Sequence, residues 1–452
     1  MKKLQDRFIE VQNQLSPSFD IVYRHIHIQD KEVWLIFLSS LTDSKLISSV
    51  VEGFVITAGN HLQTTFYPGA VDEVEKLDKA ITQMLSGQCL VLLEDSDVYY
   101  CVETRYYPSR STAEPNVEKS VRGAHDGFVE NIILNVGLIR RRIRNPDLVV
   151  SMSKNQAKTR TDIVSLYIDG LLDQDIITDF EQRMKQLNES EILSERNLVE
   201  MLYGKTWNPY PHVRYCERPD ICAIHILQGY MVILVDNSPT AIILPTTFFE
   251  QTKQIEEYTQ TTIVAVFTRL LRFMGILFSL YLLPLWIGLV IDQNPTLLAL
   301  PLRNVNVYEF GFQVIIADII VEWIRQSLIH TPTILSSIMS FVAVFLLGDI
   351  AIQIGAYTEE VLIMVALVNI GNLLTPSYEL SLANKIFRMI MECFALAFGV
   401  SGFCIGLFLH IIVLLSTKTI KYPYLYPIIP FSYKECKRIL LGQSRYDKKK
   451  KV

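Results

Sequence analysis

The run FMGILFSLYLLPLWIGLVI at residues 273–291 places 19 uncharged residues between Arg272 and Asp292. A helix of this length crosses the roughly 30 Å hydrocarbon layer of a bilayer, because each residue adds about 1.5 Å. The run excludes a fully soluble chain, and the high apolar content excludes a disordered one. We therefore expect a membrane domain that begins near residue 263.

Charge divides the 452-residue chain on either side of this run. Residues 1–272 hold 28 Lys and Arg against 36 Asp and Glu, a net charge of −8, whereas residues 273–452 hold 14 against 11, a net charge of +3. A polar globular part thus precedes a membrane part. The residues after Met1-Lys2-Lys3 contain no apolar stretch of the length that a signal peptide needs, which predicts that residues 1–262 stay in the cytoplasm.

A second long uncharged run, residues 393–416, is interrupted near its middle by Gly399, Ser401 and Gly402. Glycine and serine at such a point are typical of a helix that kinks or divides. The run therefore forms either one kinked helix or two short ones.

Three less apolar segments lie between the two runs. Each is short enough to be a buried helix of a soluble domain, but the connections are too short for another soluble domain. We therefore predict an all-α polytopic membrane domain over residues 263–416 with four to six helical segments. The three intervening segments are 308–328, 333–354 and 360–375.

Basic residues beside the membrane segments predict the orientation. Arg269 and Arg272 precede the first run, and the tail at 417–452 carries ten Lys and Arg against two acids. The positive-inside rule then places both ends of the membrane domain in the cytoplasm, which requires an even number of crossings. Four and six crossings are both consistent with the sequence.

Segment 308–328 contains three charges on one helical face. Asp318 and Glu322 are four residues apart, and Glu322 and Arg325 are three apart. Charges at membrane depth are costly and usually face a bundle interior or water. They indicate either a cation path or a structural cluster of ion pairs.

Segment 333–354 carries a stripe of small and hydroxyl residues on one face of a helix. In a ring of subunits this face would line a narrow channel, with Val344 as a hydrophobic constriction and acids near one mouth that favour cations. Close packing between helices uses the same residue types, so that alternative stays open. The stripe is Thr333, Ser337, Ser340, Val344 and Gly348, and the acids are Asp349, Glu359 and Glu360.

The N-terminal part alternates β-branched apolar runs with amphipathic helical patterns, which predicts an α/β region in two lobes, at about 20–115 and 150–250. Strands are expected at 33–40, 88–95, 98–104, 229–236 and 240–245, and helices at 42–56, 71–85 and 173–187.

A helix at about 125–144 is expected to link the lobes. It ends in a basic cluster that binds anionic lipid, bridges subunits, or only complements the helix dipole. Nucleic-acid binding is not expected, because this region is acidic overall and lacks a basic, aromatic-rich motif. The cluster is Arg140, Arg141, Arg142 and Arg144.

Catalytic signatures are missing from the sequence. It has no phosphate-binding loop, no HExxH or GxSxG motif, and its eight histidines and seven cysteines show no usual metal or redox spacing. We expect no enzyme activity and no cofactor.

Several long motifs follow one another in a fixed order: VRGAHDGFVENIILNVGLIRRRIRNPD at 121–147, YIDGLLD at 167–173, VILVDNSPTAIILPTTFFE at 232–250 and TPSYELSLANK at 375–385. Together they resemble the GerA family of spore germination membrane proteins. The stretches 317–332 and 346–351 resemble the stage V sporulation protein AF branch more than the A subunits of the nutrient receptors. One departure is Ala124-His125-Asp126, where the family usually has Pro-Arg-Glu.

The resemblance implies a non-enzymatic subunit of the spore inner membrane. Family A subunits are thought to form rings that release monovalent cations early in germination, and the AF branch is thought to amplify that release with a small membrane partner protein. Other germination receptor subunits and the lipid bilayer are the remaining partners implied. A non-conducting scaffold, an A-type receptor subunit, and a transporter that uses Asp318 and Glu322 remain alternatives.

Overall fold

The computed structural model describes most of the chain in two compact units. Its described residues are 4–28, 31–56, 69–94, 96–107, 123–154, 158–187, 191–254, 257, 260–292, 306–329, 348, 350–417, 419–420 and 422–441. An α/β unit contains the described residues of 4–205 and 213–246. A helical unit contains those of 206–212 and 247–441.

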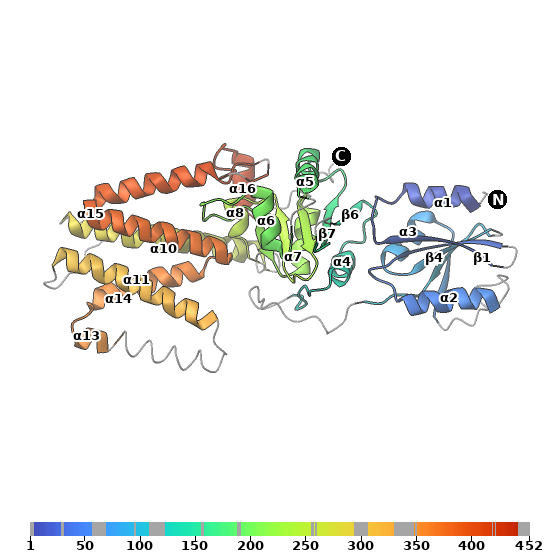
Figure 1. Ribbon diagram of the computed structural model, residues 1–452, viewed down its shortest axis with the longest axis horizontal. Coiled ribbons are helices and arrows are strands. Elements are labelled where there is room, and N and C mark those ends of the chain that lie inside the picture. Colours follow the sequence, from blue (N-terminus) through green and yellow to red (C-terminus); the bar gives the residue numbers. More distant parts are fainter. Residues whose placement is uncertain are drawn as a thin grey trace. The chain divides into compact units, whose positions relative to one another are not determined.

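The first lobe of the α/β unit is a five-stranded antiparallel sheet in the order β1-β2-β4-β5-β3, covered on both faces (Figure 1). On one face, α1 and α3 bury a core that includes Phe8, Ile36 and Met84. On the other face, α2 contributes Val50 against Val33 and Val91. The elements are α1 (Leu4–Asn13), β1 (Ile21–Ile28), β2 (Lys31–Leu38), α2 (Ser44–Ile56), β3 (Val71–Val74), α3 (Leu77–Leu85), β4 (Cys89–Leu93) and β5 (Tyr99–Val102).

The second lobe is another five-stranded antiparallel sheet, in the order β6-β7-β9-β10-β8. β9 and β10 are buried along their whole length, which explains why their sequences are continuous apolar runs. The elements are α4 (Ile132–Arg140), β6 (Leu148–Lys154), β7 (Asp162–Ile168), α5 (Gln174–Gln186), α6 (Glu195–Tyr203), β8 (Arg214–Cys216), α7 (Pro219–Leu227), β9 (Met231–Val235) and β10 (Ala241–Leu244).

The two sheets repeat one topology in the same register. β2 pairs with β4 through Val33–Ile36, and β7 pairs with β9 through Ile163–Leu166, at corresponding positions of each strand. The pairings of β4 with β5 and of β9 with β10 also correspond. α3 and α7 each have nine residues, and each is followed by a glycine at positive φ, Gly87 or Gly229, before the next strand. The α/β region in two lobes is thus confirmed, with antiparallel sheets.

Two predicted helices of the α/β unit differ from the structure. The helix expected at 71–85 begins only at Leu77, because residues 71–74 form β3 and pair with β5. The linking helix expected at 125–144 is shorter, since α4 begins after Asn131, whose side chain accepts the backbone N–H groups of Ile133 and Leu134. Pro146 lies beyond its end, and the residue before a proline disfavours helix.

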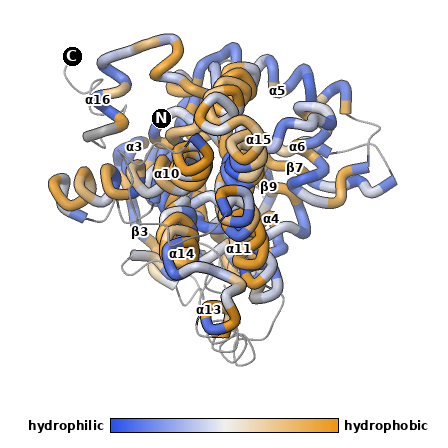
Figure 2. The backbone as a smooth tube through the Cα atoms, turned by 90° about the vertical axis from the view of Figure 1, so that its left-hand side faces the viewer, coloured by the Kyte–Doolittle hydropathy of each residue, from blue (hydrophilic) through white to orange (hydrophobic). Residues whose placement is uncertain are grey.

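The helical unit contains two helices that are long and apolar enough to cross a membrane, α10 (Thr262–Ile291) and α15 (Tyr378–Ser416). Hydrophobic residues predominate along both (Figure 2). They contain the predicted runs 273–291 and 393–416. The other helices are α8 (Phe248–Gln251), α11 (Val307–Ile329), α13 (Ala351–Gln353), α14 (Glu359–Leu373) and α16 (Tyr433–Leu441).

α15 is a helical hairpin that turns at Gly399 (Figure 1). Gly399 has φ 63° and ψ −144°, a conformation that is essentially limited to glycine. A Cβ on Gly402 would lie 1.9 Å from the carbonyl oxygen of Phe394, and one on Gly406 would lie 3.2 Å from the Cα of Met391. Residues 378–398 and 400–416 therefore run side by side in opposite directions. The sequence left open whether the run 393–416 forms one kinked helix or two short ones. In the structure it is divided between two helices at Gly399.

Candidate functional site

A buried carboxylate, Asp318 on α11, holds the helical unit together at its centre. Its Oδ1 accepts hydrogen bonds from Lys385 Nζ at 2.8 Å and from Arg388 Nη2 at 2.7 Å. Arg388 Nη2 also lies 2.9 Å from Oδ2, and Asn369 Nδ2 donates to Oδ1 at 3.0 Å. All three side chains with a formal charge are at least 97 % buried. One acid thus pairs with two bases away from solvent.

The two basic residues also fix neighbouring helices. Arg388 Nη1 donates to the carbonyl oxygen of Ser279 on α10 at 2.8 Å, and Lys385 Nζ donates to the backbone carbonyl oxygen of Asp318 at 3.0 Å. Asn369 lies on α14, so this network joins α10, α11, α14 and α15. Buried charges persist where such partners satisfy them, because an uncompensated charge in an apolar interior is costly.

Glu392, one turn beyond Arg388 on α15, is the exception. Its side chain is fully buried, and its Oε1 lies 3.7 Å from Arg388 Nε, too far for a hydrogen bond. Neither carboxylate oxygen has a hydrogen-bond partner among the described residues. A buried carboxylate without a donor is a natural acceptor for a proton, a water molecule or a cation.

Glu322 and Arg325 lie at the edge of the network and are partly exposed. Arg325 Nη2 donates to Glu322 Oε1 at 2.8 Å, and Arg325 Nη1 donates to Ser381 Oγ at 3.2 Å. Lys385 Nζ is 3.9 Å from Glu322 Oε2, which connects this pair to Asp318. Three acidic and three basic side chains therefore share one region of the bundle.

A second buried polar group lies between the two halves of α15. The Tyr210 hydroxyl is 2.6 Å from His410 Nε2 on one half and donates to Asn384 Oδ1 on the other at 3.2 Å. The Tyr281 hydroxyl of α10 is 3.0 Å from His410 Nδ1. Burial raises the pKa of Tyr210 well above its usual value, so this hydroxyl stays protonated and donates. Phe387 stacks on the Tyr210 ring.

The family model for the Bacillus/Clostridium GerA spore germination protein matches residues 9–452. The chain belongs to the GerA family. It is 36 % identical over 446 residues to stage V sporulation protein AF of Bacillus subtilis (strain 168), an alignment that covers 95 % of this chain and 90 % of that one. This confirms the family and the branch that the sequence motifs indicate.

Two further relatives extend the comparison. Spore germination protein KA of B. subtilis is 26 % identical over 447 residues, covering 95 % of this chain and 82 % of that one. The crystal structure of the N-terminal domain of the A subunit of the Bacillus megaterium spore germinant receptor GerK3 aligns at a TM-score of 0.40 with 20 % identity, covering 54 % of this chain and 96 % of that chain.

The charged residues predicted for a cation path or for structural ion pairs separate into two groups. Asp318, Glu322 and Arg325 belong to the network, although Asp318 pairs with α15 rather than with its neighbours on α11. Glu359 and Glu360 lie in the first turn of α14, where negative charge complements the helix dipole. Asp349 lies outside the described residues.

Most of the predicted pore stripe cannot be compared with the structure. Thr333, Ser337, Ser340 and Val344 lie outside the described residues. Gly348 is described, and a Cβ added there would meet no atom of the described residues within 4 Å. The pore stripe stays a prediction.

The four arginines of the GerA-family signature lie in different surroundings. Arg140 is buried and pairs with Asp20 at 2.9 Å, so it is an interior residue rather than a surface for lipid or another subunit. Arg142 pairs with Asp126 at 2.6 Å. Segment 124–126, which differs from the usual family motif, thus still ends in an acid, and this acid pairs with an arginine of the same chain. The other two arginines are exposed, and Arg141 lies over the ring of Tyr107 at 4.9 Å.

The sequence prediction missed the residues of the network that lie on α15. Lys385, Arg388 and Glu392 follow one another at intervals of three and four residues, which places them on one face of a helix. In an otherwise apolar segment this spacing signals a polar face buried against other helices.

Proposed function

We propose that the protein is a subunit of an oligomeric ion channel in the spore inner membrane, which promotes release of monovalent cations during germination and amplifies the response to nutrient receptors. GerA-family membership and the similarity to stage V sporulation protein AF support the spore role. The network around Asp318 supports conduction, because charged side chains buried among apolar helices usually serve ions or protons.

Exposed apolar side chains support a membrane location for the helical unit. Large hydrophobic residues are exposed along α10, α11, α14 and α15, which would be unfavourable in water and is ordinary against lipid. They include Phe267, Met274, Phe278, Phe312, Ile316, Ile363, Leu367, Ile370, Phe398, Ile405 and Phe408.

We propose six crossings with both ends in the cytoplasm. The α15 hairpin contributes two, and α10, α11, α14 and the predicted segment 333–354 contribute one each. An even number agrees with the basic residues that precede the apolar run 273–291 within α10 and with those that follow α15.

We further propose that the loop at 206–212 transmits a gating signal. It connects α6 and β8 of the α/β unit, yet its residues belong to the helical unit. Asn208 Nδ2 donates to Thr417 Oγ1 at 2.6 Å, and Tyr210 bridges the two halves of α15. A movement of α6 or β8 would therefore pull on the hairpin through the covalent chain.

Potassium flux from proteoliposomes tests conduction. Val344→Ala is expected to raise the flux by widening the predicted constriction. Glu392→Gln is expected to lower it by removing a buried carboxylate that has no hydrogen-bond donor among the described residues. Val368→Ala is the matched control, since it removes the same two methyl groups from the buried face of α14.

A non-conducting scaffold is the second candidate, favoured by the equal number of acids and bases in the network, three of each when Glu392 is included. It predicts intact oligomers, measured by light scattering, with no flux above that of empty vesicles in any variant or with any membrane partner. That result would refute the channel. A flux altered equally by Val344→Ala and Val368→Ala would refute the position of the constriction.

A further inference from the structure

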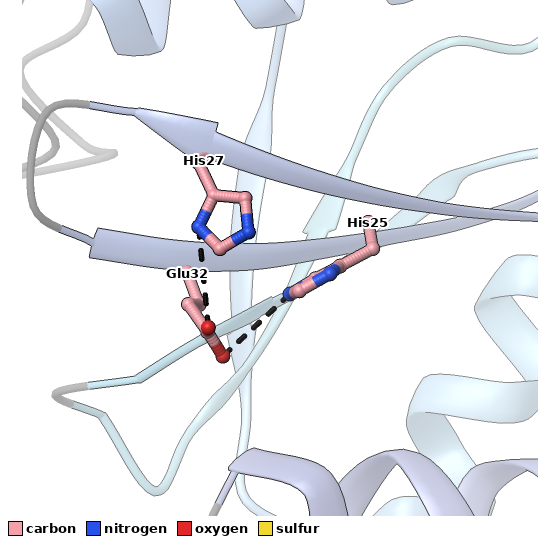
Figure 3. Close-up of side chains that lie close together, drawn as sticks. All are labelled: His25, His27 and Glu32. Atoms are coloured by element: carbon pink, nitrogen blue, oxygen red, sulfur yellow. Dashed lines mark ion pairs between the residues drawn. The ribbon is translucent and has the colours of Figure 1, made fainter.

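Two histidines and a glutamate meet on one face of the β1–β2 hairpin (Figure 3). His25 and His27 are two residues apart on β1, so both side chains project from the same face of the sheet. Glu32 lies directly opposite His27 in the register of β2. Cross-strand partners share a face, so the pairing itself brings the three side chains together.

The three potential ligand atoms surround a common point. His25 Nε2 lies 3.6 Å from Glu32 Oε2, and His27 Nδ1 lies 3.9 Å from Glu32 Oε1. All three ligand atoms lie within 4.8 Å of one another. Ligands at about 2.0–2.2 Å from a tetrahedral metal are roughly 3.4 Å apart. Small rotations of these exposed side chains would therefore complete the geometry.

The surrounding residues orient this group. The His25 ring stacks on Trp34 at 4.6 Å with an interplanar angle of 21°, and Phe8 of α1 stacks on Trp34 at 3.9 Å. The Glu94 carboxylate accepts the backbone N–H of Glu32 at 3.3 Å, which adds negative charge nearby. A held imidazole and an acidic neighbour both favour a bound cation.

The second lobe provides an internal comparison. Counting from the first pair of each hairpin, His27 and Glu32 correspond to Lys154 and Asp162, and His25 corresponds to Met152. Lys154 and Asp162 form an ordinary exposed ion pair at 3.9 Å. The repeated fold therefore needs only a charge pair at this point, and the two imidazoles are particular to the first lobe.

We propose that His25, His27 and Glu32 bind a divalent transition-metal ion of the zinc class. Two imidazole nitrogens and one carboxylate oxygen suit zinc, cobalt, nickel or copper(II) and are a poor set for magnesium or calcium. Because the side chains are exposed, at least one coordination position stays open to water or to a further ligand. The ion would join β1, the edge strand of its sheet, to β2.

Zinc titration of the full-length protein in detergent, purified without a histidine tag, tests the site. Isothermal titration calorimetry is expected to show one Zn²⁺ equivalent that is absent from the double variant His25→Ala/His27→Ala. Glu32→Gln and His27→Lys, which copies the second lobe, are each expected to weaken binding at least tenfold. Co²⁺ absorption then reports the ligand geometry.

His125→Ala is the matched control, because His125 is an exposed histidine that lies outside the β1–β2 hairpin. This variant is expected to keep the full Zn²⁺ stoichiometry. All cysteines are left in place in every variant, so zinc bound by thiols would be the same throughout. Far-UV circular dichroism and melting in EDTA check that the exposed substitutions leave the fold intact. Equal zinc binding by wild type and the double variant, or displacement of zinc by an equal concentration of Mg²⁺, would reduce the group to an exposed ion pair and overturn the proposal.

Discussion

Replacing Asp318 with asparagine removes the carboxylate between Lys385 and Arg388 at nearly constant side-chain volume. Both bases stay buried and keep only longer ion-pair contacts without hydrogen bonds, with Glu322 Oε2 3.9 Å from Lys385 and Glu392 Oε1 3.7 Å from Arg388. Breaking a buried ion pair from one side costs about 3–5 kcal/mol. We expect the melting temperature of the helical unit to fall on the order of 10 °C.

Tryptophan fluorescence in detergent follows this transition, because Trp286 lies in the buried core of the helical unit. Glu322→Gln is the matched control, since it removes an acid from a partly exposed pair with Arg325 and is expected to cost about 1 kcal/mol or less. Adding Lys385→Met to Asp318→Asn removes one of the uncompensated bases and is expected to recover part of the loss.

Two results would refute this reasoning. The first is an Asp318→Asn variant that melts with the wild type, which would mean that the buried bases need no acid. The second is a double variant whose loss in the free energy of unfolding exceeds the sum of the losses in the two single variants. Either would leave packing, rather than the charge network, as the source of stability in the bundle.

Three further predictions concern other parts of the chain. Gly399→Ala is expected to destabilise the α15 hairpin by about 1–3 kcal/mol, because a Cβ is strained at φ 63°, whereas Gly348→Ala should be close to neutral; melting compares the two. Tyr210→Phe removes a buried hydroxyl that bonds to both halves of α15 and should speed limited proteolysis of the loop at 206–212, while the exposed Trp207→Phe should not. Burial and nearby Asp72 raise the pKa of Cys101 to about 12. Since the folded state keeps a proton that the unfolded chain loses, the free energy of unfolding should fall as pH rises above 9.0, and thiol labelling should be slow until the protein unfolds.

The sequence predicts the two-lobe α/β region and the apolar helices, because both depend on periodic patterns within short segments. It fails where distant residues decide the outcome. Residues 71–74 resemble the first turn of an amphipathic helix, but pairing with β5 draws them into the sheet. The α4 helix is shorter than its apolar pattern because Asn131 caps it.

The candidate site was predictable only in part for the same reason. Asp318, Glu322 and Arg325 are visible as charges in an apolar segment. Their spacing suggests pairing along one helix, whereas Asp318 bonds to Lys385 and Arg388 on a helix that follows much later in the chain. Spacing within a segment cannot reveal which helices pack together.

The corresponding registers of the two sheets show which positions the backbone restricts and which it leaves free to vary. Each paired position of β1, β2 and β4 that has an equivalent in β6, β7 and β9 can be compared directly, so many structural places occur twice within one chain. Gly87 and Gly229 agree, both at positive φ, which marks a demand of the backbone itself. His27 and Lys154 disagree at equivalent points on an exposed strand end, which marks a place where the fold leaves the residue free to acquire a separate role.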